Sequence, residues 1–168
     1  MNKPASTVAS GSDMFLGVQT KRAGKVKGEA TADGHADDIE VRSITWGVSS
    51  PTAVGSTAAT GRRQYKHLLI VKGIDSASTG LLSALVTNDE VKEAKLTLRK
   101  AGGDALDYYV MTLAQARVVA IDLGVDDQGR PTETVSFAYA KIDIEYKRQQ
   151  GVGISGASTS FSDEVMAK

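Results

Sequence analysis

Alternation of apolar and polar side chains with a period of two recurs along this chain and restricts it to β-structure. The stretch 91–100 reads Val-Lys-Glu-Ala-Lys-Leu-Thr-Leu-Arg-Lys, so that Ala94, Leu96 and Leu98 share one face. Successive side chains of a strand point to opposite faces, so this pattern predicts a strand with one buried and one solvated face. The stretch 39–48 alternates in the same way and carries the same prediction.

Further stretches of this kind are separated by turns rich in glycine and aspartate. The predicted strands are residues 13–19, 39–48, 64–74, 91–100, 106–115, 117–125 and 132–148. The last of them changes its apolar phase near Ala140, which predicts a bulge or a passage from one sheet to another environment. The chain lacks the alternation of strands and helices that a parallel sheet requires. The series of short strands separated by turns therefore indicates a mainly β sandwich or barrel.

One short helix is predicted after the third of these strands. Ser78 is placed to cap it by accepting hydrogen bonds from the first-turn amides. The apolar residues that would then share one face are Leu81, Leu82, Leu85 and Val86. A helix of this length is not stable alone, so we expect these side chains to pack on the sheet.

The chain of 168 residues has the size of one domain. Residues 13–150 carry the predicted strands, residues 1–12 are predicted to be a disordered leader, and residues 151–168 a flexible or partly ordered tail. The first twelve residues lack the apolar core of a secretory signal. No apolar run approaches the roughly 20 residues of a membrane span, so we expect no membrane insertion.

Charge and cysteine content exclude several classes of protein. Twenty basic and 20 acidic residues give a formal net charge of zero, which argues against a nucleic-acid binder because phosphate contacts need a basic excess. A neutral surface permits self-association. The absence of cysteine excludes disulfides, thiolate nucleophiles and cysteine-ligated zinc.

The residues offer no set of side chains for covalent chemistry, and the chain is predicted not to be an enzyme. Of the two histidines, His67 lies on a predicted strand and is interpreted as a hydrogen-bonded structural residue, while His35 lies in a solvated acidic loop. A Gly-x-Gly-x-x-Gly sequence at 151–156 lacks the following helix that a dinucleotide site needs. No cofactor and no metal is therefore predicted.

Two long polar stretches stand out between the predicted strands. Residues 20–38 hold almost no large apolar side chain, and residues 49–61 hold only Val54. Loops of such length are usually functional or mobile. The first is either a floppy surface loop or an arm that reaches a neighbouring subunit. Its basic and acidic clusters are either a solvated surface or a set of complementary charges between subunits, which would select register more than add affinity.

The order of features from residue 13 to about 148 resembles the haemolysin-coregulated protein (Hcp) family. The features are Met14-Phe15-Leu16-Gly17-Val18, a long arm ending near His35, the strand Ile39 to Gly47 closing in Trp-Gly, Thr-Gly-Arg before a His-containing strand at 60–71, Lys72 to Ser78 leading into Leu81-Leu82, and final strands at 131–137 and 142–146. The family commonly has Ser-Pro at the helix start, where this chain has Ser78-Thr79. Thr can occupy this position at slight cost.

The resemblance implies a barrel of two antiparallel β-sheets flanked by one short α-helix, which closes into a hexameric ring. The family forms the inner tube of the bacterial type VI secretion machine, in which stacked rings are expelled by a contractile sheath with a spike protein at the tip. The expected protein is therefore cytoplasmic before firing and is then secreted without a signal peptide, with small effector proteins as candidate cargo in the lumen. The alternative is a β-barrel that binds a small molecule or glycan, but such a site needs an apolar cavity or an aromatic platform.

The expected contacts between subunits fall in the two long polar stretches and beside them, since a head-to-tail assembly uses two different surfaces of each subunit. The residues expected there are Lys21, Arg22, Lys25, Val26, Lys27, Glu29, His35, Asp37, Asp38, Thr52, Val54, Arg62 and Arg63.

Overall fold

The computed structural model describes residues 12–101, 106–150 and 154–165. Its strands are β1 (Ser12–Thr20), β2 (Gly24–Val26), β3 (Ile39–Val41), β4 (Ser43–Thr45), β5 (Val48–Ser49), β6 (Gln64–Tyr65), β7 (Leu68–Lys72), β8 (Val91–Lys100), β9 (Asp107–Val125), β10 (Pro131–Gln150) and β11 (Ile154–Glu164). The helix is α1 (Ala77–Val86). The expected leader falls almost wholly outside the described residues, which begin at Ser12.

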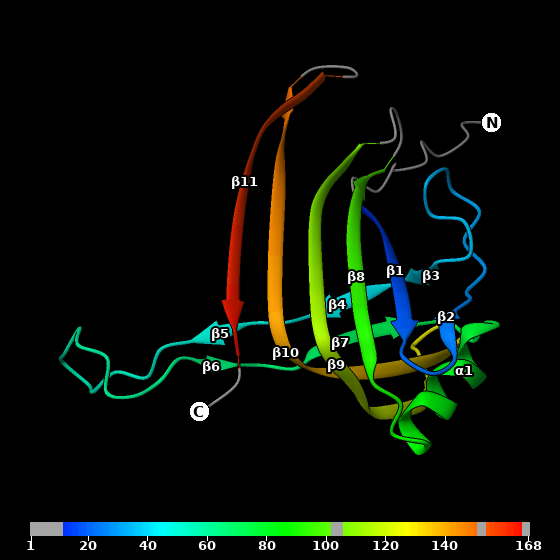
Figure 1. The fold of residues 1–168 in the computed structure, drawn as a ribbon, viewed down its shortest axis with the longest axis horizontal. Coiled ribbons are helices and arrows are strands. Elements are labelled where there is room, and N and C mark those ends of the chain that lie inside the picture. Colours follow the sequence, from blue (N-terminus) through cyan, green and yellow to red (C-terminus); the bar gives the residue numbers. More distant parts are fainter. Residues whose placement is uncertain (1–11, 102–105, 151–153, 166–168) are drawn as a thin grey trace, which may run out of the picture.

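A nine-stranded antiparallel sheet forms most of the structure (Figure 1). Its order is β2-β1-β8-β9-β10-β7-β4, with β3 beside β1 and β11 beside β10, and β5 and β6 form a separate two-stranded ribbon. Only Arg42 separates β3 from β4, and its amide donates to the carbonyl of Val71 at 2.7 Å. The stretch 39–45 therefore links β1 to β7 and curls the sheet round on itself.

The predicted class, mainly β with antiparallel pairing and one short helix, is confirmed. The geometry of the expected barrel differs, because one curled sheet that is not closed by a continuous ladder replaces two separate sheets. This single sheet is possible because β9 and β10 are long enough to serve both halves of the curl (Figure 1).

The ladder of the two long strands is irregular close to the position where the apolar phase of β10 was expected to change. The register of β9 and β10 shifts between Ser136 and Phe137, and it is unchanged across Ala140, because Tyr139 pairs with Ala116 and Lys141 with Ala114. Gln115 of β9, between these two partners, has a φ of 49°. The chain does not break there, so residues 106–115 and 117–125, predicted as two strands, form the single strand β9.

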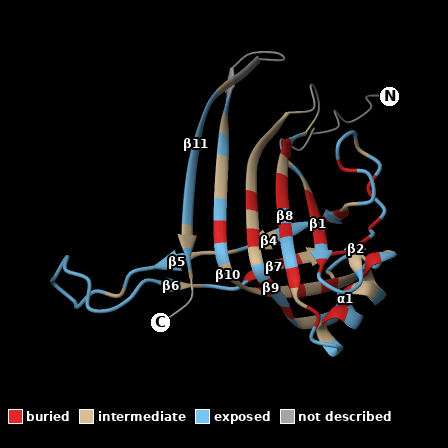
Figure 2. Cartoon of the chain, in the orientation of Figure 1, coloured by how far each residue is buried: buried red, intermediate tan, exposed pale blue. Residues whose placement is uncertain are grey.

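The core lies inside the curl and is closed at one end by α1 (Figure 2). It includes Leu16, Leu96 and Phe137, all fully buried. From the helix, Leu81 and Ala84 enter the core, whereas the expected apolar face is only partly used because Leu82 and Val86 are exposed. The alternating apolar positions of β1, β8 and β10, such as Leu16, Leu96 and Phe137, face inward because their alternation matches the pleat, whereas Phe15 lies on the other face of β1.

The start of the helix differs from the prediction. The helix begins at Ala77, whose amide donates to Oδ1 of Asp75 at 3.0 Å. Ser78 lies inside the helix, and its hydroxyl accepts from the amide of Asp75 and from Nζ of Lys72, both at 3.0 Å. The aspartate satisfies a first-turn amide, so Ser78 is free to bind a buried lysine. Within the part of the chain that is described, no helix has the length and apolar character to cross a membrane.

Candidate assembly surfaces

The stretch 20–38, predicted as a floppy loop or a reaching arm, folds back on its own sheet. Its strand β2 pairs with β1, and the side chains of Val26 and Ala30 are buried. The amide of Gly28 donates to the carbonyl of Asp37 at 2.8 Å, so the stretch also pairs with itself. It is a fixed layer on the outside of β1, and only its exposed side chains can meet a neighbour.

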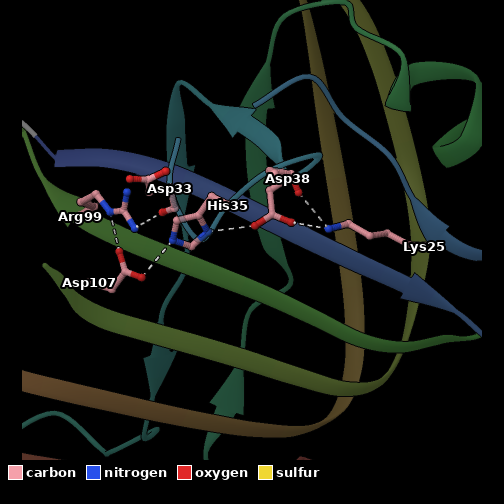
Figure 3. A network of polar contacts seen from close by, with 7 residues as sticks. Lys25, Asp33, His35, Asp38, Arg99 and Asp107 are labelled. Atoms are coloured by element: carbon pink, nitrogen blue, oxygen red, sulfur yellow. Dashed lines mark hydrogen bonds and ion pairs between the residues drawn. The ribbon is translucent and has the colours of Figure 1, made fainter. Parts of the chain in front are cut away.

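His35 anchors this layer to the sheet (Figure 3). Its ring stacks on Phe15, and its Nδ1 and Nε2 lie 2.9 Å from a carboxylate oxygen of Asp38 and 3.0 Å from one of Asp107. Ionised carboxylates only accept hydrogen bonds, so this arrangement suits an imidazolium that donates from both nitrogens. His35 is 7% exposed, and the expectation of a solvated loop histidine is wrong.

Two further cations extend the network from both ends (Figure 3). Arg99 donates from Nε to Asp107 at 2.7 Å and from a terminal nitrogen to the carbonyl of Asp33 at 2.7 Å. Lys25 donates to Asp38 at 3.0 Å. Burial acts to raise the pKa of Asp107, but the hydrogen bonds from Arg99 and His35 outweigh it and lower that pKa below its usual value. The network joins the outer layer to the consecutive strands β8 and β9, which are 66 and 72 residues away from their partners in that layer.

The second long stretch, by contrast, projects away from the sheet as a hairpin (Figure 1). We define this projecting hairpin as residues 48–65. A bridge between Thr52 and Ala59 continues the ribbon of β5 and β6, and Gly55 turns the tip with a φ of 79°. None of its described side chains is buried, and Val54 at the tip is fully exposed. A lone two-stranded hairpin is marginally stable in water, so this one needs support at its base or from a partner.

Aromatic residues support the base of the projecting hairpin. Nε1 of Trp46 donates to the hydroxyl of Tyr139 at 2.6 Å, and that hydroxyl donates to the carbonyl of Lys66 at 2.7 Å. Tyr65 lies against both rings, with centroid distances of 6.4 Å. Burial raises the pKa of Tyr139 above its usual value. Trp46 is therefore part of a structural cluster, and it does not form an aromatic platform.

An ion pair fixes the same base to the last strand. Arg63 donates to both carboxylate oxygens of Asp163 at 2.6 and 2.7 Å, and the hydroxyl of Tyr65 donates to the same carboxylate at 2.5 Å. The hydrogen bonds from Arg63 and Tyr65 lower the pKa of Asp163 to about 2. The hairpin and β11 are thus held together by a two-point contact.

The strand β11 presents an open edge and an uncovered face. Residues 154–164, expected to belong to a flexible or partly ordered tail, pair with β10 on one side and with no other described strand. Phe161 lies opposite Ile144 in this ladder and so shares the face that carries the core farther along the sheet. Phe161 and the neighbouring Tyr146 are 49% and 43% exposed. The sheet therefore extends past the end of the subunit's own core.

The sequence-based site residues fall into two groups in the structure. Exposed on the surface are Lys21, Arg22, Lys25, Lys27, Glu29, Asp37, Thr52, Val54, Arg62 and Arg63. Val26 and His35 are buried and Asp38 is half-buried, so they hold the outer layer from inside. His67 is exposed between β6 and β7, and no hydrogen bond to it is seen among the described residues, contrary to its interpretation as a hydrogen-bonded residue.

Sequence reasoning missed Phe161, Asp107 and Arg99. Phe161 stands in a run of small polar residues, which is a weak strand signal. Asp107 and Arg99 lie 72 and 66 residues from their partners in the outer layer, so no local pattern could reveal the network. In the described part of the chain, no cluster of three or more His, Asp or Glu side chains is placed to hold a metal ion.

Comparisons with known proteins agree on one family. The family model described as "Type VI secretion system effector, Hcp" matches residues 15–146. Protein hcp1 of Pseudomonas aeruginosa is 31% identical over 147 residues, which cover 84% of this chain and 86% of that protein. The "Major exported protein" of the same organism is 30% identical over 142 residues, covering 79% of each chain.

Solved structures show the same fold. A type six secretion system protein has a TM-score of 0.79 and 26% identity, and the match covers 92% of this chain and 96% of that one. Hcp1 of E. coli EAEC 042 has a TM-score of 0.72 and 24% identity, with 89% and 98% covered. Because the family model spans most of the chain and the relatives match over most of their length, the chain belongs to the Hcp family of type VI secretion system proteins, the structural and secreted proteins of the secretion tube.

Proposed function

We propose that this tube subunit closes into hexameric rings and that the rings stack head to tail into a hollow tube. The subunit is cytoplasmic before firing. A contractile sheath around the tube and a spike protein at its tip are its partners during export, and small effector proteins travel in the lumen. No cofactor and no catalytic step takes part in this role.

The open edge of β11 is the observation that carries ring closure. A strand of eleven residues with one unpaired edge is a template for another strand, and proteins that act as monomers usually protect such edges. Phe161 and Tyr146 add apolar area on the face beside it. A neighbouring copy can pair with this edge and bury this apolar face. In a closed ring every subunit has such a neighbour, so no edge of this kind stays unpaired.

The exposed residues of the outer layer and the projecting hairpin supply a second set of surfaces. They lie on different elements from β11, as head-to-tail contacts require. We assign the exposed sequence-based residues to contacts between subunits, and Val26, His35 and Asp38 to holding the outer layer that presents them. The rival function, a barrel that binds a small molecule or glycan, is not favoured, because Trp46 is already engaged by Tyr139 and Tyr65.

Sedimentation velocity tests this proposal. A species near six times the 17.7 kDa chain is expected for the parent, and Phe161→Asp is expected to shift the population toward the monomer because a buried charge opposes closure. Val86→Asp, on the exposed end of α1, is the matched control and should leave the mass unchanged. A parent that stays monomeric at high concentration would refute ring closure by the chain alone.

A further inference from the structure

The two ring nitrogens of His35 both face carboxylates (Figure 3). Nδ1 lies 2.9 Å from Asp38 in the outer layer, and Nε2 lies 3.0 Å from Asp107 in β9. The neutral imidazole has one donor and one acceptor, so only the protonated ring can donate to both carboxylates. One of the two contacts therefore depends on a proton that a histidine side chain exchanges near neutral pH.

Each of these two carboxylates has one further cation as a partner. Nζ of Lys25 donates to Asp38 at 3.0 Å, and Nε of Arg99 donates to Asp107 at 2.7 Å. The two cations lie at opposite ends of the network (Figure 3). Within the described part of the chain, His35 is the only side chain that bridges Asp38 and Asp107. The network is therefore continuous from the outer layer to β9 only while the imidazole binds both.

The charged groups that surround His35 have an excess of negative charge. The ring that touches the imidazole, Phe15 of β1, is neutral. Glu93 and Lys95 of β8 line a cavity of about 200 Å³ together with the imidazole, and Asp13 lies opposite Arg99 in the ladder of β1 and β8. The full set consists of the carboxylates of Asp13, Asp33, Asp38, Glu93 and Asp107 and the cations Lys25, Lys95 and Arg99. A proton on His35 reduces this imbalance of charge.

Loss of one proton from His35 removes one of the two contacts, whichever nitrogen keeps its hydrogen. If the hydrogen stays on Nε2, a lone pair of Nδ1 faces a carboxylate oxygen of Asp38 at 2.9 Å, inside the outer layer. If the hydrogen stays on Nδ1, a lone pair of Nε2 faces Asp107 at 3.0 Å, and the link to β9 is lost. A hydrogen bond between charged groups is stronger than a neutral one, so either loss weakens the attachment of the layer.

The turn of the outer layer that carries His35 depends on such contacts. The amide of Asp38 donates to the carbonyl of His35, and the amide of Asp37 to the carbonyl of Ala30, both at 3.0 Å. Asp37 has a φ of 64°, a conformation that is unfavourable for a residue with a side chain. The turn is thus held in an unfavourable backbone conformation, and a weaker attachment of His35 permits it to open.

We propose that a proton on His35 locks the outer layer to the sheet, and that residues 28–38 loosen when the imidazole loses this proton. Although burial acts to raise the pKa of Asp107, the hydrogen bonds from Arg99 and His35 lower it, which agrees with a donating imidazolium. The lock therefore fails at both extremes, in acid when Asp107 is protonated and in alkali when His35 is neutral. The lock is a property of the subunit itself. Its effect on contacts between subunits, which the exposed side chains of the layer would make, rests on the function proposed above.

Hydrogen exchange of the full chain measures the lock, with each amide rate divided by its intrinsic rate at the same pH. Protection at the amides of Ala30 and Asp37 should fall at least about tenfold between about pH 6 and pH 9, since one charge-assisted hydrogen bond is lost. Leu96, whose strand pairs on both sides, should keep its protection. The step should be absent in His35→Gln, which has no titrating ring, and present in the control His67→Gln, at an exposed position. Protection that is independent of pH in the parent, or an equal step in His35→Gln, would overturn the lock.

Nuclear magnetic resonance of the parent gives a second test that does not depend on how well a variant folds. The chain has two histidines, so protein labelled with ¹³C at histidine Cε1 gives two signals, and His67→Gln assigns them. The signal of His35 should titrate with the same midpoint as the fall in protection of the outer layer. A layer that loosens at a different pH from the His35 ring would overturn the lock. Sedimentation of the same samples separates the two proposals, because a parent that forms no rings at any pH refutes the proposed function, whereas coinciding midpoints support the lock in either case.

Discussion

The imidazole of His35 lies flat on the ring of Phe15, with the ring centroids 4.5 Å apart and the planes 7° apart. The contact places a polar residue of the outer layer on the ring of Phe15 in β1, over which the guanidinium of Arg99 also lies at 5.6 Å from the centroid. Together with the carboxylates of Asp38 and Asp107, it explains why a stretch with few apolar residues is fixed to the sheet. The order of this layer thus depends on polar contacts as much as on burial.

Replacement of His35 tests this dependence. His35→Leu retains volume but leaves Asp38 and Asp107 without their shared donor, so the free energy of unfolding should fall by about 1–3 kcal/mol. Urea denaturation measures the change. His67→Leu, at an exposed position, is the matched control and should stay within about 0.5 kcal/mol of the parent. Equal losses in both variants would contradict the anchoring role of His35.

Acid should weaken the same network through Asp107. Its pKa is lowered in the folded state, as the hydrogen bonds from Arg99 and His35 exceed the opposing effect of burial. A lowered carboxyl pKa contributes stability above the unfolded value of about 3.9, and this stability is lost as pH falls through the folded pKa. Unfolding free energies of the parent and Asp107→Asn should therefore differ at neutral pH and converge below about pH 4. Curves that stay parallel down to pH 3 would contradict the assignment.

The ion pair of Arg63 and Asp163 should survive milder acid. The pKa of Asp163 is about 2, so its carboxylate stays ionised in the folded state down to that pH, and its stabilising effect is fully present above the unfolded value of about 3.9 and is lost progressively as pH falls from there through about 2. Arg63→Ala should loosen the base of the projecting hairpin and speed hydrogen exchange at the amides of Val48 and Tyr65. Arg62→Ala is the control, since Arg62 binds no described residue of its own subunit and should leave exchange in the free subunit unchanged. Faster exchange in both variants would show that Asp163 is not the cause.

The strands with clean alternation were predictable from sequence because their two faces differ. Residues 91–100 and 13–19 have one apolar and one polar face, and they form β8 and β1 nearly as expected. The expected break near Gln115 is absent, since a single residue with positive φ bends the strand without ending it.

The outer layer and β11 could not be predicted in the same way. Strand β2 is held by isolated side chains such as Val26 and by charged partners distant in sequence, so no periodic pattern marks it. Strand β11 is built mainly from small polar residues, which have a low propensity for strands. It is held in place by its ladder with the long strand β10. Of the expected site residues, those at the surface remain proposals for contact, while Val26 and His35 shape the layer beneath.

A buried lysine beside the start of α1 offers a further test. Lys72 is fully buried, and its Nζ lies 2.8 Å from Asp75 and 3.5 Å from Glu133. Lys72→Met leaves two carboxylates without their cation and should reduce the unfolding free energy by about 3–5 kcal/mol. Lys66→Met, at an exposed position, is the control, and Glu133→Gln added to Lys72→Met should recover part of the loss. A loss below about 1 kcal/mol would show that the pair is not coupled to folding.

Substitution of Gly28 tests whether the stretch 20–38 is a fixed layer on β1 or an arm that can move away from it. A methyl group at its Cα would lie 2.4 Å from the carbonyl oxygen of Asp38, and that backbone is held because the Asp38 carbonyl accepts from Ala30 at 3.0 Å. Gly28→Ala should therefore destabilise the subunit by about 1–3 kcal/mol, measured by urea denaturation. In Gly47→Ala the new methyl would meet only the flexible side chain of Lys66 at 3.6 Å, so this control should stay within about 0.5 kcal/mol of the parent. If Gly28→Ala unfolds at the same urea concentration as the parent, the stretch 20–38 can move away from β1, and it would again be a candidate for an arm that reaches a neighbouring subunit.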